Sequence, residues 1–570
     1  MFRRDKLSEI RERRRQWEER TQRTSPAGSG AQERPNRFYT PADVEDHDFL
    51  SDVGFPGEYP YTAGESATAG EESGFKKPKI YAGYGTPEDT RDYYKSMLST
   101  GRGESPHMAF DLPTQCGYDS DAPMAKGEVG KTGVAVNSLQ DFETIYDAYR
   151  GEHDLDKIYS SWVINAPANI ILAMYIAIAE KRGIAPAKLA CVPQNDILKE
   201  YVARGTYIFP PKPSMRLVRD TITYCTKNMP LTSPVMISGV HIREAGATAA
   251  QVLAFTFANG IAYARLGLDA GLDVDDFAPK LTFLTFGGSM EMFQEIALQR
   301  AARRMWARIM RETFGAKNPE SWVLRAFRGA IIGNSSTTAQ RPLNNLTRTI
   351  IGGVASALSG GGGEVHPAYD EPLGLGYSLE GRQLMRDAER IIRHEARLCD
   401  VVDPLAGSYF IEGLTDKVEA EAWEILNRID DMGGAVAFIE QGHMRAEIAR
   451  SSYEYQRKLE SGEKIRVGVN KFLGSNELEV MPTRVVPHPY DPKKREDAER
   501  KQIANLAKLK RERDNSAVAS TLKELRQAAE NEKINLVPPT LAAVKAYATL
   551  GEICDVFRDV FGEYTPHSMI

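Results

Sequence analysis

The sequence of 570 residues predicts an α/β protein, namely a (β/α)8 TIM barrel with an N-terminal arm and a mostly helical C-terminal extension. Short apolar runs alternate with longer amphipathic segments through the middle of the chain, and most runs stop at Pro, Gly or polar residues. Seven or eight such repeats are enough to close a barrel of parallel strands. A doubly wound open sheet is the alternative architecture for the same pattern.

Residues 1–75 are expected to form a charged arm and a linker. Acidic and basic side chains alternate closely over residues 1–25, which predicts an exposed helix. The Pro, Gly and Ser residues of 26–36 predict a linker, and residues 65–74 have a similar composition. The globular body should start after the linker at 26–36, and the second flexible stretch precedes the first strongly patterned region.

Residues 76–415 contain the predicted strands and form the expected barrel. Each apolar run is short and is bounded by turn-forming residues, which indicates a strand buried on both faces. The runs span residues 107–113, 159–167, 189–196, 234–241, 280–288, 321–329 and 399–407. The glycine-rich segment 356–374 could contain a missing strand.

Residues 416–570 show a mostly helical pattern with blocks of mixed charge. Such blocks usually form a solvated face, although an extension of this length can also wrap a partner.

The overall composition argues against several partners. The chain has 72 basic and 78 acidic side chains, and this net charge of −6 does not favour nucleic acid or an anionic membrane. Its five cysteines lack metal-binding spacing, so we expect free thiols, a reducing compartment and no metal site. The sequence shows neither a signal peptide nor an apolar run of about 20 residues, which predicts a cytoplasmic protein without a membrane partner.

Polar residues at the ends of apolar runs are the first candidates for chemistry, because catalytic groups of a barrel lie at the carboxyl ends of its strands. This rule selects Asp111, Gln194, Asp196, His241 and Glu244. The structural alternative for each is a helix cap or a loop contact, and Asp196 is the expected N-cap of the helix that follows it. His241 could hydrogen-bond a substrate carbonyl oxygen and stabilise charge on it. Lys280, at the start of its run, is a possible anion contact.

Six longer sequence segments resemble those of a known family. They cover residues 81–90, 110–136, 194–216, 238–248, 401–412 and 465–472, and include FDLPTQCGYDSD and QNDILKEYVARGTYIFPP. Their sequences and their order resemble the large subunits of the methylmalonyl-CoA mutase family, which also includes isobutyryl-CoA and 2-hydroxyisobutyryl-CoA mutases.

The resemblance implies a barrel through which the pantetheine arm of the CoA ester threads, with adenosylcobalamin at the strand ends. It also implies a radical rearrangement in which the carbonyl-CoA group migrates to the neighbouring carbon, a reaction that must be shielded from water. The family binds cobalt from below through the histidine of a DxHxxG motif, which none of the nine histidines matches. A separate small cobalamin-binding subunit is therefore expected, in a heterotetramer of two large and two small subunits. A GTPase chaperone is a further partner that the family allows.

Four residues match family positions with a role in the reaction. The resemblance implies that His241 hydrogen-bonds the thioester carbonyl and that Gln194 lines the acyl pocket. It places Tyr81 beside the reacting carbons and Arg204 against a substrate carboxylate. The structural alternatives are a core aromatic residue for Tyr81 and a solvated residue near a helix end for Arg204.

The chain departs from the family at several substrate-facing positions. Val240 stands where the family has a tyrosine, Lys280 replaces an arginine expected to contact CoA, and Ala109 stands where the hydroxyacyl enzymes have an aspartate. The CoA-binding stretch at 66–79 and the segment 325–340 also differ. No residue is assigned to the cofactor.

The resulting expectation is an adenosylcobalamin-dependent acyl-CoA mutase whose substrate bears a carboxylate. This substrate would be methylmalonyl-CoA, succinyl-CoA or a bulkier analogue, because Arg204 needs an anion to offset its desolvation. The alternatives are an isobutyryl-CoA/butyryl-CoA mutase and a catalytically silent assembly scaffold.

Overall fold

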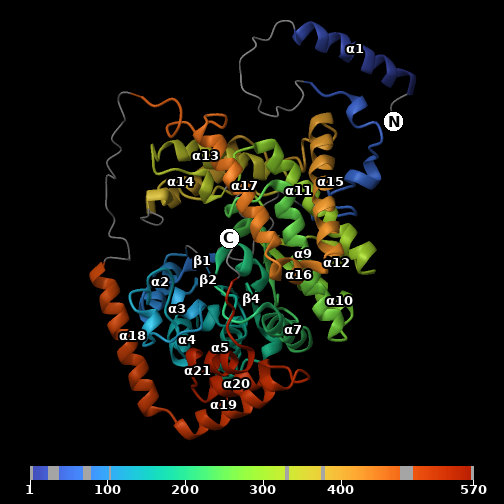
Figure 1. Cartoon of the computed structure of the whole chain (residues 1–570). Coiled ribbons are helices and arrows are strands. Elements are labelled where there is room, and N and C mark those ends of the chain that lie inside the picture. Colours follow the sequence, from blue (N-terminus) through green and yellow to red (C-terminus); the bar gives the residue numbers. More distant parts are fainter. Residues whose placement is uncertain are drawn as a thin grey trace.

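Seven short parallel strands and a larger number of helices make up the described part of the chain (Figure 1). The computed structural model describes residues 4–22, 38–68, 79–101, 104–284, 286–327, 333–373, 379–474 and 492–566.

The strands follow one another in sequence order. Four of them form one sheet and three form a second. Backbone hydrogen bonds join the two sheets, since the N–H of Met236 donates to the Gln194 carbonyl at 2.8 Å and that of Ser233 to the Cys191 carbonyl at 2.9 Å. The strands are β1 (Lys79–Ala82), β2 (Ser105–Ala109), β3 (Tyr159–Val163), β4 (Ala190–Pro193), β5 (Met236–Ser238), β6 (Thr282–Leu284) and β7 (Ala326–Phe327). A doubly wound sheet requires a reversal of strand order, which these seven strands lack. The strand order therefore favours the (β/α)8 barrel over the doubly wound sheet.

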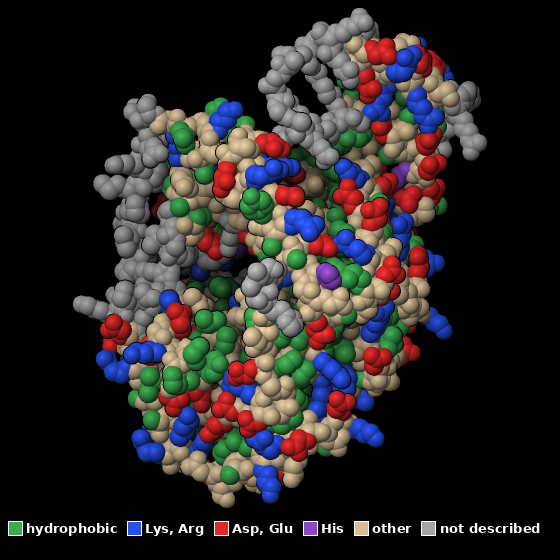
Figure 2. Space-filling model, in the orientation of Figure 1, with side chains coloured by type: hydrophobic (Ala, Val, Ile, Leu, Met, Phe, Trp, Pro, Cys, Tyr) green, Lys and Arg blue, Asp and Glu red, His purple; other side chains and the backbone are tan. Residues whose placement is uncertain are grey.

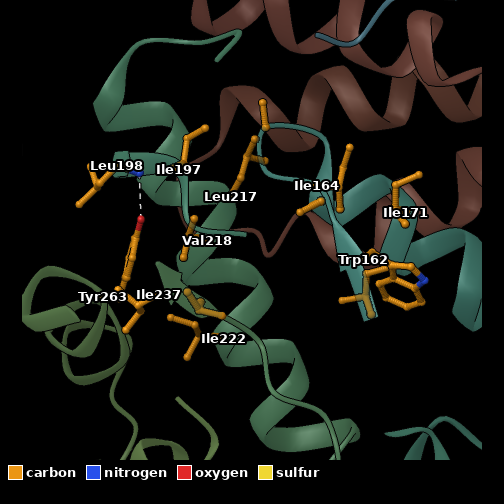
Figure 3. Close-up of a cluster of buried hydrophobic side chains, with 14 of the residues drawn as sticks. Trp162, Ile164, Ile171, Ile197, Leu198, Leu217, Val218, Ile222, Ile237 and Tyr263 are labelled. Atoms are coloured by element: carbon orange, nitrogen blue, oxygen red, sulfur yellow. Dashed lines mark hydrogen bonds between the residues drawn. The ribbon is translucent and has the colours of Figure 1, made fainter. Parts of the chain in front are cut away.

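One face of the sheets is apolar and packs against helices. Met108, Trp162, Cys191, Ile237 and Phe283 are buried on this face and belong to the main hydrophobic core. Figure 3 shows part of this core, where Ile237 of β5 lies near Ile222 of helix α7 (Pro211–Asn228) and Trp162 of β3 lies near Ile171 of the helix at 168–181. Burial of such side chains is the main stabilising contribution to the fold.

The opposite face carries polar side chains. The strand register places Tyr81, His107 and Ser161 side by side, and His107 Nδ1 lies 2.6 Å from Ser161 Oγ. Side chains alternate between the two faces of a strand, so these three point away from the apolar face.

Helices cover the apolar face, and most follow a strand in sequence. Capping residues define several of these helices, as where Thr248 and Gln251 form a capping box at the start of α9. The main ones are α2 (Pro87–Ser99), α4 (Leu139–Tyr146), α5 (Ala168–Lys181), α7, α9 (Ala249–Asp269), α11 (Met292–Arg308) and α13 (Asn344–Leu358).

Two expected strands are not confirmed. Residues 399–407 form bends and turns, because buried Asp403 adopts a positive φ of 48° and its carboxylate binds Arg300 of α11. The prediction of a strand there was wrong. Residues 356–373 contain the end of α13 and turns, and no strand lies in this described part of the segment.

The N-terminal arm begins with the predicted helix, α1 (Arg4–Gln22). Arg14 anchors it through an ion pair of 2.5 Å with Asp43. The expected linker at 26–36 lies outside the described residues.

The C-terminal region is mostly helical, as expected. It comprises α15 (Tyr409–Asp431), α16 (Gly434–Glu440), α17 (His443–Glu460), α18 (Pro492–Glu512), α19 (Asn515–Glu530), α20 (Val537–Lys545) and α21 (Leu550–Phe561). Helix α20 packs against α5, and α19 to α21 share the main core with the strands (Figure 1).

The surface matches the mixed composition, since acidic and basic side chains are interspersed over the face shown in Figure 2. None of the helices in the described ranges is both long and apolar enough to cross a membrane.

Candidate active site

The structure brings Tyr81, Gln194, Arg204 and His241 together at the carboxyl ends of β1, β4 and β5. Gln194 directly follows β4, and Arg204 ends the turn η6 (Glu200–Arg204) that continues α6 (Ile197–Lys199). The charge of Arg204 lowers the pKa of His241 and opposes the effect of burial on the pKa of Tyr81.

Lys199 and Asn165 fix the orientation of the Gln194 amide. The amide oxygen accepts hydrogen bonds from Lys199 Nζ at 2.8 Å and from Asn165 Nδ2 at 3.0 Å. Lysine has no acceptor, so the oxygen must face this pair and the amide NH2 group must face away from it. Gln194 is therefore held as a hydrogen-bond donor.

Glu200 is the centre of a buried polar network beneath the site. Its Oε1 accepts from Lys199 Nζ at 2.5 Å and from Asn165 Nδ2 at 2.6 Å, while Oε2 accepts from the N–H and hydroxyl of Thr206 at 3.0 and 2.6 Å. Burial alone would raise the pKa of Glu200, but the charges of Lys199 and Arg204 lower it. Glu200 is thus a carboxylate with both oxygens already engaged.

Arg204 has a guanidinium with unused donors. Its Nη1 lies 3.7 Å from Glu200 Oε1, beyond hydrogen-bond distance, and it is buried without a hydrogen-bond partner in the described ranges. The side chain is 27% exposed, so the guanidinium can still be approached from one side. A buried unpaired donor is costly, which makes this position suitable for an anionic ligand.

His241 lies in the first turn of α8 (Gly239–Glu244), which begins directly after β5. Its Nδ1 is 2.6 Å from Ser238 Oγ, whereas Nε2 has no hydrogen-bond partner among the described residues. Burial lowers its pKa well below the ordinary value, and the nearby Lys199 and Arg204 lower it further. His241 is therefore neutral near pH 7.

Tyr81 faces an accessible space although it belongs to a strand. It is 44% exposed, and its ring lies 5.3 Å from that of His107. Desolvation raises the pKa of its hydroxyl, so Tyr81 remains a phenol. The alternative of a buried core aromatic residue does not fit this exposure.

Val240 and Ala109 lie near these groups, but Lys280 does not. Val240 precedes His241 in α8 and is half-buried, and Ala109 is the last residue of β2. Lys280 lies in the short turn before β6, hence at the amino end of that strand. In a parallel sheet the amino and carboxyl ends lie on opposite edges, so Lys280 is separated from His241.

The other sequence candidates have structural contacts. Asp111 accepts the N–H groups of Thr114 at 3.0 Å and Gly130 at 2.8 Å, and Glu244 accepts that of Ser335 at 2.9 Å. They hold loops together.

Asp196 occupies the N-cap position of α6 as predicted, but its side chain does not cap the helix. It accepts hydrogen bonds from the Tyr263 hydroxyl and from the Ser238 N–H instead.

Sequence reasoning missed Asn165, Lys199, Glu200 and Ser238. Lys199 and Glu200 look like solvated helix residues by composition, yet both are essentially inaccessible. The only signal in the sequence for Lys199 and Glu200 was their position within the family segment QNDILKEYV, between the candidate residues Asp196 and Arg204.

A large cleft lies over the loops that follow β5, β6 and β7. It has a volume of about 1010 Å³, and its lining includes Arg243, Gly288, Ser335, Arg348 and Arg466. Arg348 donates only to the neutral acceptors Thr338, Asn345 and Val467, and Arg466 only to Ser335 and Tyr455. Both guanidiniums thus face the cleft without a carboxylate partner in the described part of the chain.

No group of His, Cys, Asp and Glu suited to a metal ion occurs among the described residues. The fold and the site together define an α/β protein with neutral and cationic hydrogen-bond donors at the carboxyl ends of parallel strands.

Comparison with known proteins agrees with this class. The methylmalonyl-CoA mutase family matches residues 30–563. The large subunit of 2-hydroxyisobutanoyl-CoA mutase from Aquincola tertiaricarbonis is 41% identical over 93% of this chain and 91% of its own length. Methylmalonyl-CoA mutase from Escherichia coli (strain K12) is 39% identical over 92% of this chain and 71% of its own. The methylmalonyl-CoA mutase large subunit of Streptomyces virginiae is 37% identical over 92% and 70%, respectively.

The chain belongs to the methylmalonyl-CoA mutase family. It is therefore an isomerase of the acyl-CoA mutase type.

Proposed function

We propose that this chain is the substrate-binding large subunit of an adenosylcobalamin-dependent acyl-CoA mutase that acts on a carboxylate-bearing thioester. The observation that carries the substrate class is the guanidinium of Arg204. Its buried Nη1 has no hydrogen-bond partner among the described residues, and both oxygens of its ion-pair partner Glu200 are already hydrogen-bonded by other groups. A substrate carboxylate would satisfy these donors and offset the cost of burying the cation.

The thioester end of the substrate would bind to His241 and Gln194. A neutral imidazole can donate from Nε2 to the thioester oxygen, and the Gln194 NH2 group is held as a second donor by Lys199. Donors fixed before the reaction stabilise charge and spin on the migrating carbonyl without reorganisation. Tyr81, exposed to the same space, would pack beside the reacting carbons and exclude water.

The cleft of about 1010 Å³ suits part of a cofactor as large as a corrin, because its lining mixes hydroxyl, amide and cationic donors that match amide side chains. Arg348, Arg466 and Ser335 are the residues that we expect to contact it. When bound, adenosylcobalamin supplies the radical chemistry that removes a hydrogen from the substrate.

We also propose that the strands close into a (β/α)8 barrel around the pantetheine arm. Consecutive strand order and a polar face carrying Tyr81, His107 and Ser161 support this proposal, since an open sheet would bury both faces in apolar helices. In this proposal residues 1–75 form the arm, 76–415 the barrel and 416–570 the extension.

A small cobalamin-binding subunit carrying DxHxxG is the proposed partner. Two relatives are named as large subunits, and no histidine of this chain lies in that motif. A heterotetramer of two large and two small subunits is the assembly that we propose, and a GTPase chaperone is a further candidate partner.

The test combines the purified chain with a candidate small subunit, adenosylcobalamin and a panel of thioesters. The panel contains methylmalonyl-CoA, a larger alkylmalonyl-CoA, isobutyryl-CoA and 2-hydroxyisobutyryl-CoA, and mass spectrometry detects the rearranged products. We expect turnover of the carboxylate-bearing thioesters. A preference for isobutyryl-CoA would favour the second mutase class, and a stable but inactive complex would favour a scaffold.

A further inference from the structure

Ser238 makes an unusual contact for a residue at the start of a helix. It occupies the N-cap position of α8, where a serine hydroxyl ordinarily accepts a backbone N–H of the first turn. Its side chain makes no such bond and instead lies with Oγ 2.6 Å from Nδ1 of His241. The Ser238 hydroxyl therefore hydrogen-bonds to the imidazole of His241 and not to the backbone of the helix.

The direction of this hydrogen bond decides what His241 can do. If Nδ1 carried the proton, Nε2 would be an acceptor and could not bind a carbonyl oxygen. If the Ser238 hydroxyl donates to Nδ1, the single proton of the neutral ring must lie on Nε2, which becomes a donor.

The surroundings favour donation by the serine. Ser238 Oγ makes no other hydrogen bond to the residues that the structure describes, so its proton has Nδ1 as the acceptor at hand. The reverse arrangement would leave the hydroxyl proton of a buried serine without an acceptor, which is costly.

Two buried residues hold the backbone of Ser238 in place. Its N–H donates to Asp196 Oδ2 at 2.8 Å, and Asp196 Oδ1 accepts the Tyr263 hydroxyl at 2.6 Å. Tyr263 is itself fixed by the N–H of Leu198, at 2.9 Å (Figure 3). Burial raises the pKa of Asp196 to about 6, so this carboxyl is mainly ionised near pH 7 and remains an acceptor.

We infer that Ser238 is a positioning residue that selects the Nε2–H tautomer of His241 and thereby makes His241 a hydrogen-bond donor toward the substrate. The tautomer is a property of the chain alone. Its consequence for turnover rests on the proposed function.

The first experiment measures the tautomer without using the reaction. The full chain is labelled with ¹⁵N-histidine, the His241 signals are assigned by their loss in His241→Ala, and both ring nitrogens are observed near pH 7. We expect a protonated Nε2 and a bare Nδ1 in the wild type and in Ser238→Thr, which keeps the hydroxyl. Ser238→Ala should show a mixture of tautomers. A wild-type ring protonated on Nδ1, or an unchanged ring in Ser238→Ala, overturns the inference.

The second experiment is a double-mutant cycle on turnover. His241→Ala should lower kcat by about 10²–10³, the usual cost of losing one such donor. Ser238→Ala alone should lower kcat about 5–10-fold, as expected for a hydrogen bond near 1 kcal/mol, with little change in KM.

In the His241→Ala background, Ser238→Ala should change kcat less than twofold, because the serine acts through the histidine. Additive losses would indicate a merely structural role and overturn the inference. If the wild type turns over no thioester, the proposed function fails, while the NMR result still decides the tautomer.

Discussion

Arg204 is the side chain whose surroundings say most about the substrate. Its nearest carboxylate, Glu200, is engaged by Lys199, Asn165 and Thr206, so the guanidinium has donors to spare. The sequence alone left a solvated residue as the alternative, because neither the burial of Glu200 nor its bonds can be read from spacing.

Arg204→Gln should therefore separate the substrate classes. The change removes the cation that faces a carboxylate, at a cost on the order of 2–5 kcal/mol in transition-state binding for a buried pair. Measurement of kcat/KM for methylmalonyl-CoA and isobutyryl-CoA on both proteins provides an internal control. A neutral or improved result with the carboxylate-bearing thioester would contradict the assignment.

Val240 leads to a proposal about substrate size. The family tyrosine at this place would fill more of the acyl pocket than valine, and protein interiors rarely leave such space empty. Val240 is half-buried next to His241, which fits a residue that borders the substrate. We propose a substituent on the substrate carbon larger than methyl.

Val240→Tyr should shift preference toward methylmalonyl-CoA by about 1–3 kcal/mol, the range for small steric differences in an apolar pocket. The ratio of kcat/KM for an alkylmalonyl-CoA and for methylmalonyl-CoA gives this shift directly. If the wild type already prefers methylmalonyl-CoA over every larger analogue, the larger pocket does not exist.

At the scale of elements, the apolar runs located strands well but overstated their length. The run at 234–241 was read as strand throughout, whereas β5 ends at Ser238 and α8 starts at the next residue. An apolar sequence suits a buried first turn of helix as well as a strand, so periodicity could not separate the two. Strand β1 was missed, since none of the predicted apolar runs covers residues 79–82.

The turn at 399–407 shows another limit of pattern reading. Its apolar residues resemble a strand, but Arg300 binds both Asp403 and Glu412 and so ties this turn to α15. Long-range ion pairs of this kind leave no local signature in a sequence. Tertiary contacts therefore override the local preference.

His47 joins the N-terminal segment to α15 through charged groups. It faces Glu412 at 3.3 Å, Asp416 at 3.6 Å and Asp52 at 3.9 Å. Arg300 also pairs with Glu412, and Arg304 with Asp416. The nearby carboxylates, Asp416 first and then Glu412 and Asp52, raise the pKa of His47 against the lowering effect of burial.

The folded state thus binds the His47 proton more tightly than the unfolded state. Its stabilising contribution is fully present below the unfolded pKa of about 6.5 and is lost as the pH rises through the higher folded value. The difference in Tm between wild type and His47→Gln should therefore be larger at pH 6 than at pH 9. His443→Gln, at an exposed site beside Gln441, is the matched control and should show no such trend. An equal difference at both pH values would contradict this account.

At the scale of the whole molecule, we expect the 570-residue chain to be inactive without a partner. It offers no histidine in a DxHxxG motif to bind cobalt from below. Isothermal titration should show weak binding of adenosylcobalamin to the chain alone, and activity should appear only when the small subunit is added. Turnover by the chain with cofactor alone would refute this prediction.

The class of architecture was predictable because strand and helix patterns alternate in order along the chain. The register of the strands and the joining of β4 to β5 could not be predicted, since both depend on backbone hydrogen bonds between distant residues. The network around Glu200 could not be predicted either, because its hydrogen bonds connect members that lie up to 41 positions apart in the sequence.

The contacts of Asp119 join two regions of the chain that the ribosome synthesises at very different times. This buried carboxylate accepts the Thr549 hydroxyl at 2.7 Å and the Gly551 N–H at 2.8 Å, 430 and 432 residues away, and the Leu550 N–H donates to the Asn137 carbonyl. A ribosome adds about 5–20 residues per second, so the loop after β2 waits roughly 20–90 s for these partners. Nascent chains should accordingly expose residues 117–137 to a protease until the segment around position 550 emerges from the ribosome and completes the packing of this loop.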